Sequence, residues 1–160
     1  VGHGSEFEVR LPALRAGTRA AARRPEPAPL RAAVASKRVL IVDDNVDAAE
    51  LLAASLDALG HVTRVAYDGP SALQAAVDFV PEVALLDIGL PVMDGYELAR
   101  QLRQMDTASP TWLVAITGYG QAADRRSAHE AGFDEHLVKP VNVDALLGIL
   151  RRLDAAAGES

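Results

Sequence analysis

The sequence predicts an α/β fold: a doubly wound, five-stranded parallel sheet with helices on both faces. From Lys37 onward, short apolar runs rich in Val and Ile alternate with segments of helical period. Such runs are typical of strands buried on both faces by the helices that connect them. By analogy with known sheets of this kind, we expect the strand order 2-1-3-4-5, with functional groups at the carboxyl ends of the strands.

Each expected strand is a short apolar run bounded by turn-forming or polar residues. The five runs are 39–42, 62–66, 83–86, 112–116 and 136–138. All five are too short for helices and rich enough in β-branched residues to be strands. They therefore supply the whole of the predicted sheet.

Helices are expected between the strands. The first should bury one apolar face, made of Ala48, Leu51, Leu52, Ser55 and Leu59, and end at Gly60. The second is expected over 71–80; the third is marked by Leu98, Leu102 and Met105, and the last by Leu146, Leu150 and Leu153. Segment 121–131 has only a thin alanine stripe, so its helix should be the least firmly packed.

Two segments precede this domain. Residues 1–14 contain alternating apolar and charged side chains, the period of a strand that needs a partner. Residues 15–36 are rich in Pro, Ala and Arg, which favours a semi-extended linker. The main domain is then expected over 37–155, followed by a tail at 156–160.

Composition excludes several classes of function. The chain has no cysteine, hence no disulfide or thiolate metal site, and no apolar run long enough to cross a bilayer. Residues 37–160 carry ten basic against nineteen acidic groups. Binding to nucleic acid requires a basic face, so we expect neither a nucleic-acid partner nor direct membrane contact.

Chemically active residues follow four of the five strands. Asp43 and Asp44 follow the first, Asp87 the third, Thr117 the fourth and Lys139 the fifth. Three carboxylates at one sheet edge repel each other unless a cation or raised pKa values relieve them. Mg²⁺ prefers such oxygen ligands, and the hydroxyl and ammonium groups could hold further oxygens of an anion.

Ordinary interpretations compete with this one. An aspartate pair after a strand can cap the next helix, and Asn45 or Asp47 remain candidates for that role. Taken singly, each of the other residues is as easily structural. Their conjunction favours transfer of a phosphoryl group to a carboxylate, with Lys139 neutralising developing charge.

These motifs resemble the receiver domain of two-component response regulators over about three quarters of the chain. The matching stretches are VLIVDDN, ALLDIGLPVMDGYEL, VAITG and HLVKP. The resemblance implies that Asp87 is the phosphoacceptor and that the receiver domain catalyses only its own phosphorylation and dephosphorylation. It also implies that Asp43, Asp44, Asp87 and the backbone carbonyl of Gly89 bind Mg²⁺, with Mn²⁺ as an alternative.

The resemblance assigns further roles near the last strand. Thr117 and Lys139 would bind the phosphoryl group, and the bond before Pro140 would be cis. His136 occupies the position where the family usually has Tyr or Phe as a switch residue. This departure puts the aromatic switch in doubt, and an imidazole there could add pH sensitivity.

A second resemblance concerns GHGSEFEVRLP near the N-terminus. It is similar to the last strand of the ATP-binding domain of sensor histidine kinases, although GSEF could also come from a cloning site. The expected context is therefore the C-terminal receiver of a hybrid histidine kinase, cytoplasmic, with a parent kinase that could be membrane-anchored. The expected partner is a histidine kinase or histidine phosphotransfer domain. The sequence leaves open whether the domain also forms a homodimer.

Other functions remain as alternatives. A stand-alone response regulator would use the same site without a kinase in the chain. A degenerate docking or dimerisation module should have lost Asp87 or Lys139, and both are present. A Mg²⁺-dependent phosphohydrolase would need a second acidic residue two positions after Asp87, where the sequence has Gly89.

Overall fold

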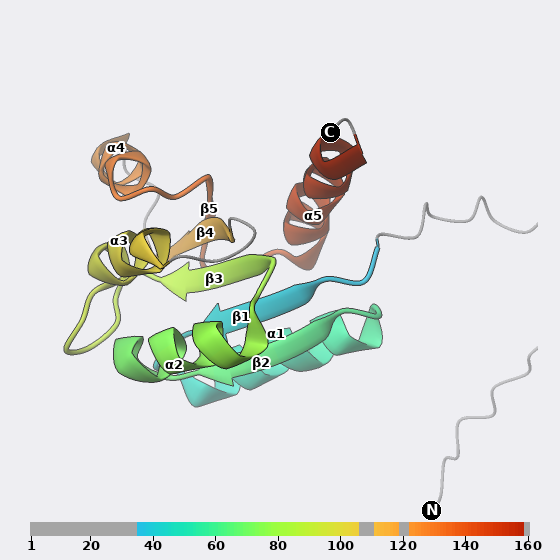
Figure 1. The fold of residues 1–160 in the computed structure, drawn as a ribbon, viewed down its shortest axis with the longest axis horizontal. Helices are drawn as coiled ribbons and strands as arrows, with labels where there is room; N and C mark the ends of the chain where they lie inside the picture. Colours follow the sequence, from blue (N-terminus) through green and yellow to red (C-terminus); the bar gives the residue numbers. More distant parts are fainter. Residues whose placement is uncertain (1–34, 106–110, 119–121, 159–160) are drawn as a thin grey trace, which may run out of the picture. The chain divides into compact units, whose positions relative to one another are not determined.

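The computed structural model describes residues 35–105, 111–118 and 122–158. The strand expected within 1–14 and nearly all of the linker expected at 15–36 lie outside these residues. Within them, five parallel strands form one sheet in the order β2-β1-β3-β4-β5, which confirms the predicted doubly wound fold (Figure 1). The strands are β1 (Arg38–Val42), β2 (Val62–Ala66), β3 (Val83–Asp87), β4 (Trp112–Thr117) and β5 (Glu135–Val138).

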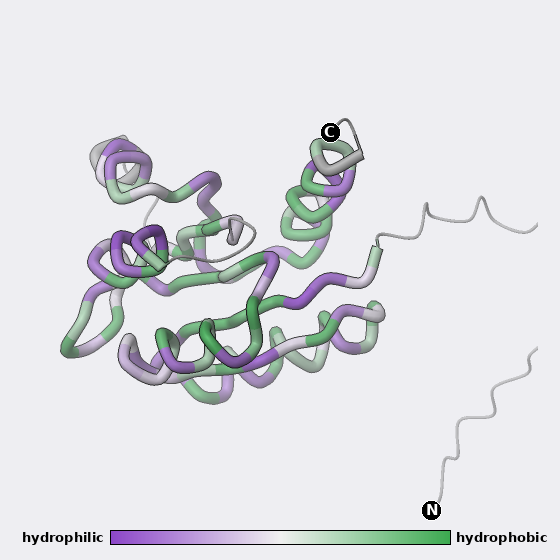
Figure 2. Tube along the Cα trace, in the orientation of Figure 1, coloured by the Kyte–Doolittle hydropathy of each residue, from purple (hydrophilic) through white to green (hydrophobic). Residues whose placement is uncertain are grey.

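Five helices cover the two faces of this sheet. They are α1 (Val46–Ala58), α2 (Gly69–Phe79), α3 (Gly95–Gln104), α4 (Ala122–Glu130) and α5 (Val143–Gly158). Side chains of α1 and α5 share one apolar core with one face of the sheet, and side chains of α2, α3 and α4 share another with the opposite face. Apart from Arg38, which begins β1, and Asp87, which ends β3, the central strands β1 and β3 are accordingly apolar, whereas the helices alternate in hydropathy (Figure 2). No helix in the described ranges is long and apolar enough to span a membrane.

The buried face of α1 differs from the predicted one. Ala49, Ala53 and Leu56 face the sheet, whereas Leu51 is 71% exposed and Leu59 46% exposed. Two stripes of apolar residues run along this helix at helical spacing, and the prediction chose the bulkier one. The small alanines let the helix axis lie close to the sheet, which leaves the leucine stripe at the rim of the interface.

Two helices end as their glycines suggest. At the end of α1, the N–H of Gly60 donates to Asp57 O and that of His61 to Leu56 O, with Gly60 in the left-handed region at φ 92°. The end of α4 repeats this pattern, with Gly132 at φ 97°. Both are the glycine-ended motif that satisfies the last carbonyls of a helix.

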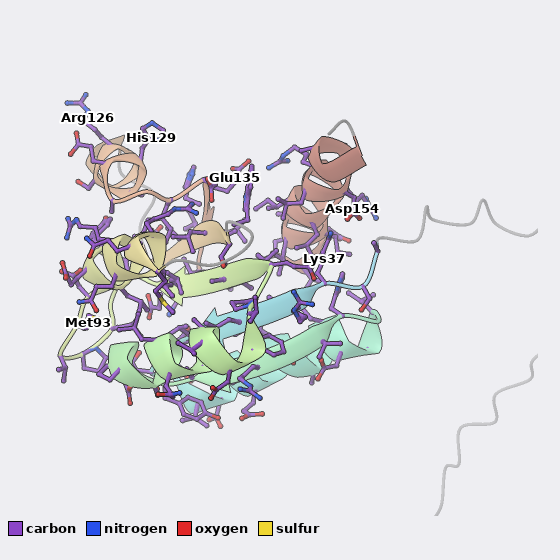
Figure 3. The ribbon with its side chains drawn as sticks, in the orientation of Figure 1. Lys37, Met93, Arg126, His129, Glu135 and Asp154 are labelled. Atoms are coloured by element: carbon purple, nitrogen blue, oxygen red, sulfur yellow. The ribbon has the colours of Figure 1, made fainter. Side chains whose placement is uncertain are left out.

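A charged cluster lies at the end of the sheet where β1 begins. Lys37 Nζ is 2.8 Å from Asp154 Oδ1 on α5 and 3.4 Å from Glu82 Oε1 before β3 (Figure 3). His61 lies beside Lys37 and is only 5% exposed. Its Nδ1 accepts a hydrogen bond from the backbone N–H of Lys37, and its buried Nε2 has no hydrogen-bond partner among the described residues.

Stability should fall in mild acid because of His61. Burial lowers the pKa of His61 below its ordinary value of 6.5, with Asp154 opposing this shift and Lys37 adding to it. The unfolded chain therefore binds a proton more readily than the folded one, so the His61 contribution is present above the unfolded pKa and is lost as the pH falls below it. That loss is at most about 1.4 kcal/mol at about pH 5.5.

Urea unfolding at about pH 7.5 and about pH 5.5 tests this contribution. Because glutamine does not titrate, His61→Gln should show a smaller loss of unfolding free energy between the two pH values than the wild type. His129→Gln is the matched control, since His129 is exposed on α4. Equal losses in the wild type and His61→Gln would contradict the prediction.

Candidate functional site

Three carboxylates meet at the carboxyl ends of β1 and β3. Carboxylate oxygens of Asp43, Asp44 and Asp87 all lie within 4.8 Å of one another. Asp43 and Asp87 are buried, with 5% and 6% exposure, whereas Asp44 is exposed. The pairing of β1 with β3 in parallel register places these residues side by side, as the sequence predicted.

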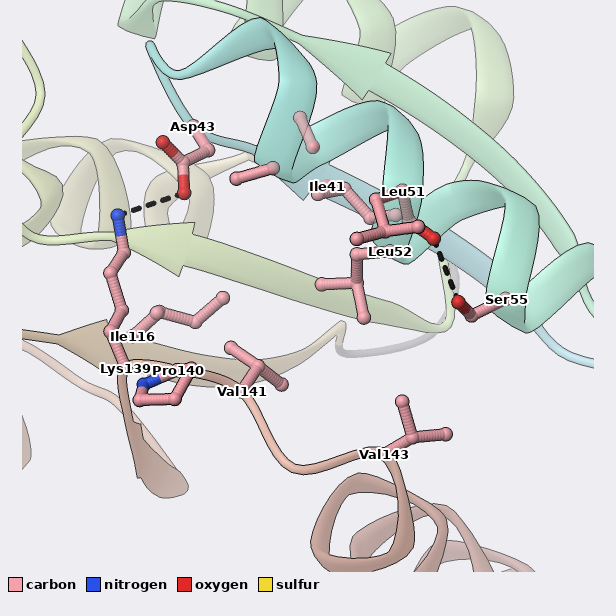
Figure 4. Close-up of a pocket in the computed structure, with 12 residues that line it drawn as sticks. Ile41, Asp43, Leu51, Leu52, Ser55, Ile116, Lys139, Pro140, Val141 and Val143 are labelled. Carbon is pink, nitrogen blue, oxygen red and sulfur yellow. Dashed lines mark hydrogen bonds and ion pairs between the residues drawn. The ribbon is translucent and has the colours of Figure 1, made fainter. Parts of the chain in front are cut away.

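Lys139, at the end of β5, joins two of these carboxylates. Its Nζ lies 2.8 Å from Asp87 Oδ2 and 2.9 Å from Asp43 Oδ2. Figure 4 shows the contact with Asp43. Burial acts to lower the pKa of Lys139, but its hydrogen bonds to Asp87 and Asp43 and their charges outweigh burial, so the pKa is raised. Lys139 therefore remains an ammonium ion at neutral pH.

Local backbone groups orient the two buried aspartates. Asp43 Oδ1 accepts a hydrogen bond from the N–H of Asn45, and Asp87 Oδ1 accepts one from the N–H of Gly89. Asn45 is itself the N-cap of α1, its side chain accepting from Ala48 N. Asn45 thus caps α1, and the carboxylates of the neighbouring Asp43 and Asp44 belong to the acidic cluster.

A pocket of about 380 Å³ opens above Asp87. It is lined by Asp87, Ile88, Gly89, Tyr96, Thr117, Gly118 and Lys139. Thr117 Oγ1 is buried there and has no hydrogen-bond partner among the described residues, which is costly unless a further polar group is bound. Among the described residues, nothing lies within 4 Å of where a Cβ on Gly118 would be, so they leave the Gly118 side of the pocket open.

The start of α3 is pressed against the backbone at the end of β3. A Cβ on Gly95 would lie 2.5 Å from the carbonyl oxygen of Asp87, and the N–H of Gly95 donates to Ile88 O. Only glycine allows this approach. The loop between β3 and α3 is thereby fixed relative to Asp87.

Two predicted residues lie elsewhere. The Lys139–Pro140 peptide bond is cis, and Pro140 lines a different, mainly apolar groove of about 550 Å³ between α1 and the segment after β5 (Figure 4). His136 is also absent from the lining of the Asp87 pocket; it borders a pocket of about 150 Å³ between α4 and β5. The prediction that His136 acts at the phosphoryl site gains no support from this position.

The aromatic residue of the pocket was missed by the sequence analysis. Tyr96, in the first turn of α3, lines the Asp87 pocket. The available signal was its place in DGYEL directly after Gly95. Its side-chain direction depends on the close approach of α3 to β3, which the sequence pattern alone does not reveal.

The donor set fits a hard divalent cation. Carboxylates of Asp43, Asp44 and Asp87 supply oxygen ligands of the kind that Mg²⁺ prefers. Next to them, one ammonium group and one unpartnered hydroxyl face the same pocket. This combination can stabilise a phosphoryl group bound to a carboxylate.

Comparisons with known proteins agree with this chemistry. Residues 39–151 match the family model of the response regulator receiver domain. Over 96% of its length, the chain is 35% identical to the sensor histidine kinase AtsR of Burkholderia thailandensis, of which it covers 26%. It is 37% identical to the transcriptional regulatory protein PrrA of Mycobacterium leprae, over 79% of this chain and 55% of PrrA. The chain thus spans about a quarter of one relative and about half of the other.

A solved structure is similar as well. The receiver domain of a sensor histidine kinase from Pseudomonas aeruginosa, with a magnesium ion coordinated in its active site cleft, superposes with a TM-score of 0.66 at 30% identity. The superposition covers 74% of this chain and 97% of that one.

Proposed function

Since this chain belongs to the response regulator receiver domain family of two-component signalling, we propose that Asp87 is the residue that accepts the phosphoryl group. The observation that carries this proposal is the position of Asp87, which alone among the three clustered aspartates lines the pocket with Thr117 and Lys139. Asp43 and Asp44 follow β1 and belong to the same carboxylate cluster.

Receiver domains bind Mg²⁺ at their acidic site, and the cluster here has the ligands for it. We assign Asp43, Asp44, Asp87 and the backbone carbonyl of Gly89 to the cation, with Mn²⁺ as a substitute of the same ligand preference. When bound, the cation offsets repulsion between the incoming phosphoryl group and the aspartates.

The chain's own residues supply the nucleophile and the groups that stabilise the transferred phosphoryl group. A carboxylate oxygen of Asp87 forms a bond to phosphorus, while the bond from phosphorus to the imidazole nitrogen of a phosphohistidine breaks and its electron pair stays on that nitrogen. Lys139 Nζ, 2.8 Å from Asp87, lies next to the new phosphoryl oxygens and neutralises their charge. Thr117 Oγ1, which lacks a partner in the described residues, donates to one of them.

For the context, we propose the receiver of a hybrid histidine kinase. The match to AtsR extends over 156 residues, beyond the receiver and across the segments 1–14 and 15–36. This supports a kinase-derived strand at 1–14, a linker at 15–36, the receiver at 37–155 and a short tail. The phosphodonor would be a histidine kinase or histidine phosphotransfer domain; a stand-alone regulator is the alternative, since PrrA is also similar.

Intact mass measurement tests the proposal. With Mg²⁺ and acetyl phosphate, the wild type should gain the mass of one phosphoryl group, and chelation of Mg²⁺ should prevent the gain. Asp87→Ala should gain nothing, whereas Asp78→Ala, which changes an exposed aspartate on α2, should behave like the wild type. A gain that persists in Asp87→Ala would overturn the assignment.

A further inference from the structure

Two aromatic rings connect the Asp87 pocket to the end of α4. Tyr96 lines the pocket, and its ring meets that of Phe133, which follows α4, at a centroid distance of 6.3 Å and an interplanar angle of 81°. This edge-to-face arrangement is a favourable one for aromatic pairs, worth about 0.5–1.5 kcal/mol beyond burial. The pair bridges α3 and the turn between α4 and β5.

The Tyr96 side of this contact is fixed to the phosphoacceptor strand. Gly95, the preceding residue, is hydrogen-bonded to Ile88 O and packed against Asp87 O. Asp94 caps α3 by accepting a hydrogen bond from Glu97 N. The backbone of Tyr96 therefore has little freedom relative to Asp87, so any response of Tyr96 to a change in the pocket falls on its ring.

The Phe133 side is fixed to α4. The N–H of Phe133 donates to Ala128 O in the last turn of that helix, and its side chain is only 4% exposed. Arg103 of α3 holds the adjoining turn through Gly132 O and the Asp134 carboxylate. A movement of the Phe133 ring is therefore transmitted to the C-terminal turn of α4.

The electrostatics of aromatic rings supply the coupling. A ring presents a negative face and a positive edge, so a new anion in the pocket changes the preferred orientation of the Tyr96 ring. Because Phe133 is buried, the ring pair must rearrange together, and packed interiors change between discrete arrangements. His136 lies outside this pocket and is not placed to respond directly.

We propose that Tyr96 is the positioning residue that transmits the state of Asp87 to α4, through its ring contact with Phe133. The proposal rests on Asp87 being the phosphoacceptor. It assigns the role of the switch residue to α3 instead of β5. The response is carried by the ring itself, so phenylalanine should replace Tyr96 and leucine should not.

Hydrogen exchange of the amides in 127–133 tests the proposal, measured before and after phosphorylation by acetyl phosphate with Mg²⁺. Intact mass fixes the phosphorylated fraction of each variant, so that samples are compared at equal phosphorylation. The wild type and Tyr96→Phe should show the same phosphorylation-dependent change in exchange rate. In Tyr96→Leu we expect that change to shrink at least fivefold.

Two further variants separate a transmitting role from a structural one. Phe133→Leu removes the partner ring outside the pocket and should also lose the response while accepting the phosphoryl group normally. His136→Ala should keep the response. The proposal is overturned if Tyr96→Leu or Phe133→Leu responds like the wild type, if Tyr96→Phe does not respond, or if His136→Ala alone loses the response. Failure of the wild type to gain mass would instead overturn the phosphoacceptor assignment on which the proposal rests.

Discussion

Lys139→Met is expected to unfold more easily than the wild type in the absence of Mg²⁺, by about 1–2 kcal/mol, and to regain stability when Mg²⁺ is added. In the structure, Lys139 is the partner of two buried carboxylates, Asp43 and Asp87. Its removal leaves them without a counter-charge, a loss of about 1–3 kcal/mol for a buried group, reduced here because the Lys139 side chain is 33% exposed. A divalent cation bound by the same carboxylates replaces the missing charge.

The same variant should accept a phosphoryl group about 10²- to 10³-fold more slowly, the usual effect of removing one group that stabilises developing negative charge. Urea unfolding with and without Mg²⁺, and the rate of mass gain with acetyl phosphate, measure the two effects.

Lys37→Met is the matched control. Lys37 also joins two carboxylates, those of Glu82 and Asp154, but near the start of β1. Its loss of stability should be insensitive to Mg²⁺, and its phosphorylation rate should be unchanged. If Mg²⁺ reduced the difference in unfolding free energy from the wild type equally in both variants, a specific cation site at the carboxylates beside Lys139 would be contradicted.

The second large effect concerns Asp44→Asn, which should raise the dissociation constant for Mg²⁺ at least tenfold. Asp44 is exposed, so the substitution costs the fold little, but it removes one of three anionic ligands from the cluster. Each tenfold change corresponds to about 1.4 kcal/mol of binding free energy.

Isothermal titration with Mg²⁺ measures the constant directly. Asp47→Asn, three residues further along in the first turn of α1, removes the same charge outside the cluster and should bind Mg²⁺ as the wild type does. An Asp44→Asn protein with unchanged affinity would remove Asp44 from the ligand set.

The sheet and the acidic cluster follow from the sequence because both depend on local patterns. Fully buried strands require short runs of Val, Ile, Leu and Ala, and the five predicted runs differ from the observed strands by one residue or less at each end. Parallel strands bring their carboxyl ends to one edge, and the strand order taken by analogy puts β1 beside β3, so Asp43, Asp44 and Asp87 were expected to be neighbours. Neither step depends on how side chains pack.

What the sequence did not reveal depends on packing between elements. The prediction took the wrong stripe of α1 to be buried. Either the alanine stripe or the leucine stripe could face the sheet, and only the distance between helix and sheet decides which one does. His61 is buried where the end of α1 meets Lys37, close enough to Asp154 of α5 for its charge to act on the imidazole. Lys37 and Asp154 lie far from His61 in the sequence, so no local pattern predicts this burial. Tyr96 enters the pocket because Gly95 lets α3 touch Asp87, a contact that no periodicity encodes.

The most direct test of the central claim locates the phosphoryl group on the chain. After phosphorylation with acetyl phosphate and Mg²⁺, borohydride reduction converts an acyl phosphate of aspartate into homoserine, and peptide sequencing by mass spectrometry finds its position. We expect homoserine at residue 87 and at no other aspartate. Homoserine at residue 43 or 44, or a phosphorylated protein that yields none at 87, would contradict it.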